Sequence, residues 1–114
     1  SQEYVNQTLD NSFRKYRNIN GIFVPSSRVF KVASFLSGKK PEIRLIGYDL
    51  IEENIPFLEN DTINFLISQK PVEQGYQGIM ALLSHLVLKK ELKKNIYLPI
   101  DIITKENLNY YLEY

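Results

Sequence analysis

The chain has 114 residues, of which 44% are hydrophobic and 24% charged, a composition typical of one globular domain. Its 14 Lys and Arg residues against 13 Asp and Glu residues give a net charge of +1, which removes the usual electrostatic argument for nucleic-acid binding by the chain itself. The absence of cysteine excludes disulfides, zinc-thiolate sites, iron–sulfur clusters and thiol nucleophiles. No apolar run approaches the roughly 20 residues of a membrane span, so we expect no membrane partner.

The first half of the chain predicts two helices that alternate with two strands. Apolar residues recur at helical spacing over 5–16 and again over 29–36. The continuous apolar run at 22–24 is typical of a strand that is buried on both faces, and the segment 43–48 is predicted as the second strand.

The second half continues this alternation and ends in a tail. The predicted elements are a short helix over 54–59, a strand over 63–67, a helix over 72–88, a strand over 97–103 and a polar, aromatic tail with one helical turn over 104–114. Pro99 lies inside the last strand, which favours a sheet edge or an irregular crossover for it. Alternating helices and strands with short connections predict an α/β fold, with three layers and a mostly parallel sheet flanked by helices.

Polar side chains follow three of the predicted strands, where ligands bind in open α/β sheets. Ser26 follows the first strand, Asp49 the second and Gln69 the third. A hydroxyl, a carboxylate and an amide suit hydrogen bonding to a polyol, because the carboxylate accepts from hydroxyls while the amide both donates and accepts. We therefore predict these three residues as ligand-binding.

Structural roles compete with this interpretation. Asp49 could cap the next helix, Ser26 and Ser27 could cap the helix that follows them, and Gln69 could be an exposed turn residue. The same set lacks a partner base, a metal-ligand pair and a glycine-rich phosphate loop. We therefore predict no catalytic residues, no metal, no cofactor and no enzymatic activity.

Four segments together resemble the effector domain of LacI-type transcription regulators, which has a periplasmic-binding-protein-like fold. The run Ile43-Arg-Leu-Ile-Gly-Tyr-Asp49 resembles that family's strand ending in Gly-Phe/Tyr-Asp. Leu66-Ile-Ser-Gln69, followed by Gln74-Gly75, is similar to its strand-to-helix junction. The segments 21–28 and 98–103 resemble its Asn-Asp segment and its late Leu-Pro strand, although Ser26 replaces the family's Asn and Pro71 its aromatic residue.

The resemblance implies a cytoplasmic sensor of a small effector, in most relatives a sugar, that controls DNA binding by closing two lobes. It assigns the gripping of ligand hydroxyls to Asp49 and Gln69. Residues 1–114 would be the C-terminal part of the effector domain, a fragment that contains the second lobe. The other lobe and the DNA-binding headpiece would lie upstream, so this chain would contact DNA only through them.

The helix over 72–88 would then present an uncovered apolar stripe, from which we expect a homodimer. A periplasmic solute-binding protein or receptor ectodomain of the same fold is the alternative function. A response-regulator receiver domain shares the length and the alternation, but it needs paired acidic residues where the chain has Pro25, Ser26 and Ser27.

Overall fold

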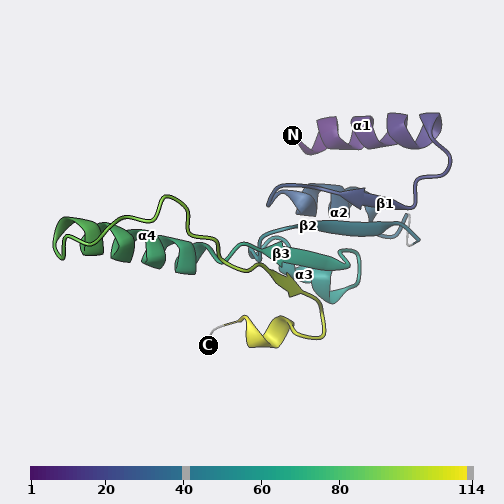
Figure 1. Cartoon of the computed structure of the whole chain (residues 1–114). Helices are drawn as coiled ribbons and strands as arrows, with labels where there is room; N and C mark the ends of the chain where they lie inside the picture. The colour runs from purple at the N-terminus through teal and green to yellow at the C-terminus, as the bar shows by residue number, and fades with distance from the viewer. Residues whose placement is uncertain (40–41, 113–114) are drawn as a thin grey trace.

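A computed structural model describes residues 1–39 and 42–112. Its elements follow the predicted alternation of helices and strands (Figure 1). In chain order they are α1 (Gln2–Lys15), β1 (Gly21–Phe23), α2 (Val29–Leu36), β2 (Arg44–Tyr48), α3 (Ile55–Glu59), β3 (Phe65–Ser68), α4 (Pro71–Leu86), β4 (Asp101–Ile103) and the 3-10 helix η1 (Leu108–Tyr110).

The described strands form one sheet in the order β1-β2-β3-β4. β1 pairs parallel with β2 and β2 parallel with β3, with Ile46 opposite Phe65, whereas β4 runs antiparallel to β3, with Leu66 opposite Ile103. The prediction of a mostly parallel sheet flanked by helices is confirmed. The antiparallel β4 is an edge strand, as Pro99 suggested.

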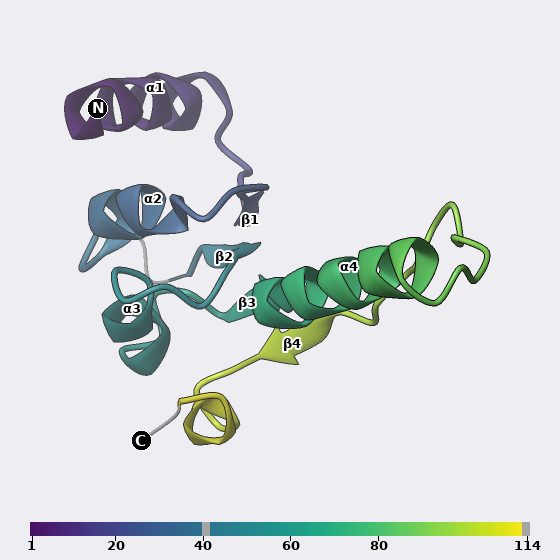
Figure 2. The same ribbon diagram turned by 90° about the vertical axis from the view of Figure 1, so that its left-hand side faces the viewer.

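The hydrophobic core lies between the sheet and the two helices α2 and α3, which cover the same side of it (Figure 2). Alternate residues of the central strands point into this core, as the period of two along a strand requires. The fully buried members include Val29, Leu45, Leu58, Leu66 and Ile103. Residues of all four strands belong to this core or pack against it, so the core holds the strands and their ends in place.

Gly47 lets α2 come close to the centre of the sheet. A Cβ atom built at Gly47 would lie 2.4 Å from Val29 Cβ and 2.6 Å from both of its methyl carbons. Carbon atoms at van der Waals contact are about 3.5–4.0 Å apart, so no side chain fits at Gly47 without moving the helix. The Gly-Tyr-Asp run therefore serves packing as well as any binding role.

The N-terminal helix packs on the outside of α2. The rings of Phe13 and Phe35 are stacked, with their centroids 6.2 Å apart, and Gln2 Nε2 donates a hydrogen bond to the Lys31 carbonyl over 2.8 Å. Ser1 caps the helix by accepting from the Tyr4 N–H. α1 thus adds a further layer next to α2.

The helix α4 and the segment that follows it, residues 87–100, extend away from the sheet as one arm (Figures 1 and 2). We call residues 87–100 the return segment. The arm gives the molecule extents of 59 × 32 × 23 Å and a radius of gyration of 18.3 Å, against about 13 Å expected for a compact chain of this length. The long helix was predicted, but its end lies two residues earlier than expected, at Leu86.

The predicted strand over 97–103 is wrong in its first four residues. Only Asp101–Ile103 pair with β3, whereas Tyr97, Leu98 and Ile100 lie along the arm and line a hollow beside α4. The tail forms the expected single turn as η1, and residues 113 and 114 lie outside the described part of the chain. Lys105 joins this tail to the loop after α3 through a hydrogen bond to Asp61, whose carboxylate raises the pKa of the Lys105 ammonium.

We expect Gly47→Ala to lower the free energy of unfolding by about 1–3 kcal/mol, because the new methyl group overpacks the contact with Val29. Gly75→Ala is the matched control, since a Cβ at Gly75 meets no atom within 4 Å and alanine favours the helix by up to about 1 kcal/mol. Urea denaturation of both variants measures the difference. Equal stabilities would contradict the close packing at Gly47.

Candidate functional site

The loops after β1, β2 and β3 meet at one edge of the sheet and border a surface hollow of about 640 Å³. Parallel strands place their carboxyl ends at the same edge, which is why segments far apart in sequence converge there. The lining residues include both polar and apolar side chains. They come from Ser27, Asp49, Leu50, Ile51, Ser68, Pro71, Val72, Ile103, Tyr111 and Leu112.

Asp49 is held at this edge by its main chain. Its backbone has a φ of 74°, in the left-handed region that few residues other than glycine, asparagine and aspartate adopt. The Asp49 N–H donates to the Ile67 carbonyl over 2.9 Å, and the Asp49 carbonyl accepts from Asn54 Nδ2 over 2.9 Å. Asn54, and not Asp49, occupies the N-cap position of α3.

Asn54 is the one buried polar or charged side chain in the described part of the chain, with an exposed fraction of 0%. Its Nδ2 also donates to the Ser27 carbonyl over 3.0 Å, and lies 3.4 Å from the Tyr48 carbonyl. One carboxamide thus bridges the loop after β1 to the loop after β2. Both loops contribute a side chain to the hollow.

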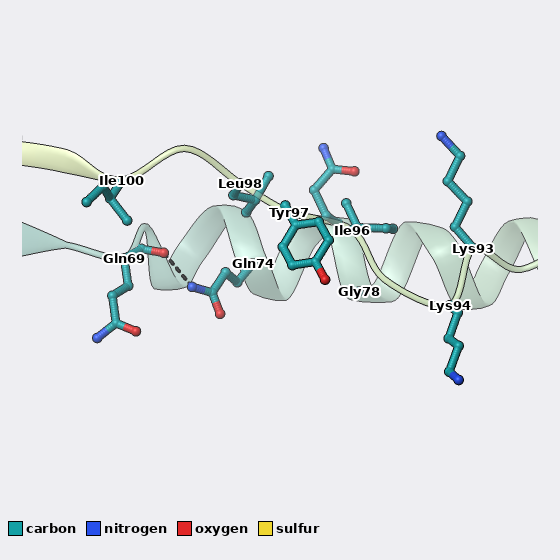
Figure 3. Close-up of a pocket in the computed structure, with 10 residues that line it drawn as sticks. Gln69, Gln74, Gly78, Lys93, Lys94, Ile96, Tyr97, Leu98 and Ile100 are labelled. Atoms are coloured by element: carbon teal, nitrogen blue, oxygen red, sulfur yellow. Dashed lines mark hydrogen bonds between the residues drawn. The ribbon is translucent and has the colours of Figure 1, made fainter.

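Gln69 lies apart from Asp49 in the described structure. It lines a second hollow of about 430 Å³, between α4 and the return segment, rather than the one that Asp49 lines (Figure 3). Gln74 Nε2 donates a hydrogen bond to the Gln69 main-chain carbonyl, while the Gln69 side chain is exposed (Figure 3). The adjacent Ser68 lines the Asp49 hollow, whereas Gln69 does not.

Ser26 occupies a turn rather than the hollow's wall. It is exposed, and its Oγ accepts a hydrogen bond from the Arg28 N–H over 3.2 Å, which is the local turn-forming role that serine often has. The neighbouring Ser27 is the residue of this loop that lines the hollow.

The hollow offers one carboxylate, two serine hydroxyls and the phenol ring of a tyrosine. Asp49 accepts hydrogen bonds, Ser27 and Ser68 both donate and accept, and Tyr111 adds a flat apolar surface. This set suits a neutral ligand rich in hydroxyl groups. Among the described residues, no group of three or more His, Asp or Glu side chains could hold a metal ion.

Two residues of this edge were missed by the sequence analysis. Tyr111 comes from the tail and reaches the hollow only because β4 and η1 fold back beside β3. Asn54 stands in a polar run, Glu52-Glu53-Asn54, which resembles an ordinary helix start. Nothing in that run distinguishes a buried amide from an exposed cap.

An α/β sheet with a polar hollow at the carboxyl ends of its strands defines a ligand-binding domain of the open-sheet class. The family model for the periplasmic binding protein domain matches residues 1–91. The chain therefore belongs to the periplasmic binding protein domain family.

Solved structures with the same fold include a provisionally assigned regulator and solute-binding proteins. A Bacteroides fragilis protein provisionally assigned as a LacI transcriptional regulator is 38% identical, with a TM-score of 0.84 over 94% of this chain and 37% of its own. A glucose-galactose binding protein from Geobacillus stearothermophilus is 20% identical, with a TM-score of 0.80 over 95% of this chain and 39% of its own. A solute-binding protein of a Burkholderia graminis ABC transporter, in complex with D-arabinose, is 19% identical, with a TM-score of 0.83 over 99% of this chain and 41% of its own.

The chain thus spans about two fifths of the length of these structures. Their descriptions are of a provisionally assigned regulator and of two proteins that bind sugars. No curated protein sequence matches the chain. Within the described ranges, no helix has the length and hydrophobicity needed to cross a membrane.

We expect Asp49→Ala to lower the free energy of unfolding by about 1 kcal/mol, because alanine disfavours the left-handed backbone at this position. Asp49→Gly should be close to the parent chain in stability, since glycine adopts that backbone freely. Thermal or urea denaturation of the pair checks this. If the alanine and glycine variants are equally stable, Asp49 is not held in the left-handed conformation.

Proposed function

We propose that this chain is the C-terminal part of a sugar-sensing effector domain in a LacI-type transcription regulator. The observation that carries the proposal is the convergence of Asp49, Ser27 and Ser68 on one hollow at the carboxyl edge of the sheet. Their hydrogen-bonding capacity matches the hydroxyls of a monosaccharide. Gln69, the residue after Ser68, and Ser26, in the turn after β1, complete the proposed ligand-binding set.

A regulator is favoured over a transporter by sequence similarity. The provisionally assigned LacI regulator is 38% identical to this chain, about twice the identity of the glucose-galactose binding protein at 20% and the ABC-transporter solute-binding protein at 19%. A periplasmic solute-binding protein or receptor ectodomain is the second candidate, because those structures share the fold. The sequence upstream of Ser1 distinguishes the two: a helix-turn-helix favours the regulator and a secretion signal the alternative.

In the proposed mechanism, the sugar favours one arrangement of two lobes over another. Ligand that binds between the lobes stabilises their closed arrangement, and the population shifts toward it by the difference in affinity. Closure would then change the spacing of paired DNA-binding headpieces in a cytoplasmic regulator. This chain contributes binding groups to that step and performs no catalysis.

We expect the 114-residue chain to bind D-arabinose or D-glucose in the millimolar range, because it carries only part of a two-lobed site. Titration followed by nuclear magnetic resonance should shift the amide signals of Ser27, Asp49 and Ser68. Asp49→Asn keeps the left-handed backbone but removes the charge, and should weaken binding about tenfold, since hydrogen bonds to charged groups contribute about 1.5–3 kcal/mol.

Glu52→Gln provides the control for that titration, since it removes a carboxylate from an exposed position outside the hollow. It should leave the affinity unchanged. The absence of any sugar-dependent shift at tens of millimolar, or an Asp49→Asn variant that binds as well as the parent, would contradict the proposed site.

A second copy of the chain is the proposed partner for the apolar stripe of α4. The stripe consists of Val72, Tyr76, Ile79, Leu83 and Leu86, whose exposed fractions run from 44% to 85%. Their 4-3-4-3 spacing is the seam by which helices pair. The opposite face of α4, with Gln74 and Gln77, borders the return segment.

Charge favours an antiparallel pair of α4 helices. Glu73 stands in the first turn, whereas His85 and Lys89 stand at or just beyond the last turn. A two-fold axis across the stripe brings the acidic end of each helix to the basic end of its partner and also opposes the two helix dipoles.

We expect the chain to be dimeric in sedimentation equilibrium, and Leu83→Glu to make it monomeric, because a buried charge would replace a leucine of the stripe. Gln77→Glu adds the same charge to the opposite face and should leave the dimer intact. A parent chain that remains strictly monomeric at high concentration would contradict this proposal.

A further inference from the structure

We infer that Asn54 is a positioning residue for the ligand site, acting through the main chain of Asp49 and Ser27. The effect on ligand binding rests on the proposed sugar-binding function, whereas the positioning itself rests on the hydrogen bonds of Asn54. The side chain itself does not line the hollow.

The burial of the Asn54 side chain carries a cost in free energy, so packing alone does not explain an asparagine at this position. Its Oδ1 is buried and has no hydrogen-bond partner within the described residues. A buried acceptor without a partner costs free energy, so a leucine of similar size would suit the apolar surroundings better. The donors of the same carboxamide therefore have to account for the presence of asparagine.

Those donors fix two loops at once. The two hydrogens of Nδ2 match the carbonyls of Ser27 at 3.0 Å and Asp49 at 2.9 Å, and the nitrogen lies 3.4 Å from the Tyr48 carbonyl. Three neighbouring acceptors also determine which end of the carboxamide is nitrogen, because an oxygen placed there would face three carbonyl oxygens.

The result is that Asp49 is held on both sides of its Cα atom. Its N–H is bound to β3 through Ile67, its carbonyl is bound to Asn54, and its φ of 74° is left-handed. A main chain fixed in this way does not have to be ordered when a ligand binds to the Asp49 carboxylate, so binding costs less conformational entropy. Asn54 thus fixes the main-chain positions from which the Asp49 and Ser27 side chains reach the hollow.

Asn54→Leu in the 114-residue chain tests this inference with two readouts. We expect the affinity for D-arabinose to fall about tenfold, because the main chain that carries the Asp49 carboxylate is no longer preorganised. We also expect the three-bond coupling between the amide and α protons of Asp49 to move away from its left-handed value. In the Asp49→Asn background, Asn54→Leu should weaken binding little further, because both changes act on the same group.

Asn64→Leu is the matched control. Asn64 Oδ1 accepts a hydrogen bond from the Leu45 N–H over 2.7 Å, so this variant also removes a carboxamide that binds the main chain, but at the opposite end of the strands. It should reduce stability while leaving both the affinity and the Asp49 coupling unchanged.

The outcomes separate the inference from the proposed function. An Asn54→Leu variant that keeps both the affinity and the Asp49 coupling overturns the positioning role. If the parent chain binds no sugar, the proposed function fails, and the Asp49 coupling alone decides whether Asn54 holds that backbone. Should Asn54→Leu not fold, Asn54→Ser, which leaves one shorter donor in place, is measured in the same way.

Discussion

The hydrogen bond from the Asp49 N–H to the Ile67 carbonyl is the contact on which the arrangement of the site depends. It extends the parallel pairing of β2 and β3 one residue beyond the end of β2. The chain can then leave the sheet only by turning at Asp49, which adopts a left-handed backbone. Lys70 makes the corresponding left-handed turn after β3. These two turns send one segment into α3 and the other out along the arm.

The order of elements follows from the sequence because apolar periodicity is a local property. The strands near 22–24, 43–48 and 63–67 are short apolar runs between turn residues, and each is present in the sheet. The fourth strand was predicted too long, because Tyr97 and Leu98 are as apolar as strand residues but lie beside α4. Periodicity shows that a residue prefers an apolar neighbour, not which element supplies it.

The candidate site was predictable in part for the same reason. Asp49 follows a recognisable strand, so its place at the carboxyl edge can be expected from sequence. The position of Gln69 depends on the left-handed turn at Lys70. Tyr111 reaches the hollow because β4 pairs antiparallel with β3. Asn54 contacts the Ser27 carbonyl, 27 residues away in the chain. Such contacts arise from tertiary packing, which a single sequence does not encode in a readable local pattern.

Gly47 gives the Gly-Tyr-Asp run a second significance. The approach of Val29 to its Cα means that the glycine is required by the helix behind the sheet, whether or not any ligand is bound in front of it. Homologous chains that no longer bind a ligand should therefore retain a glycine at the position of Gly47, while the residue at the position of Asp49 varies. Glycine retention at this position is accordingly a marker of the fold, and only the carboxylate beside it reports on the ligand.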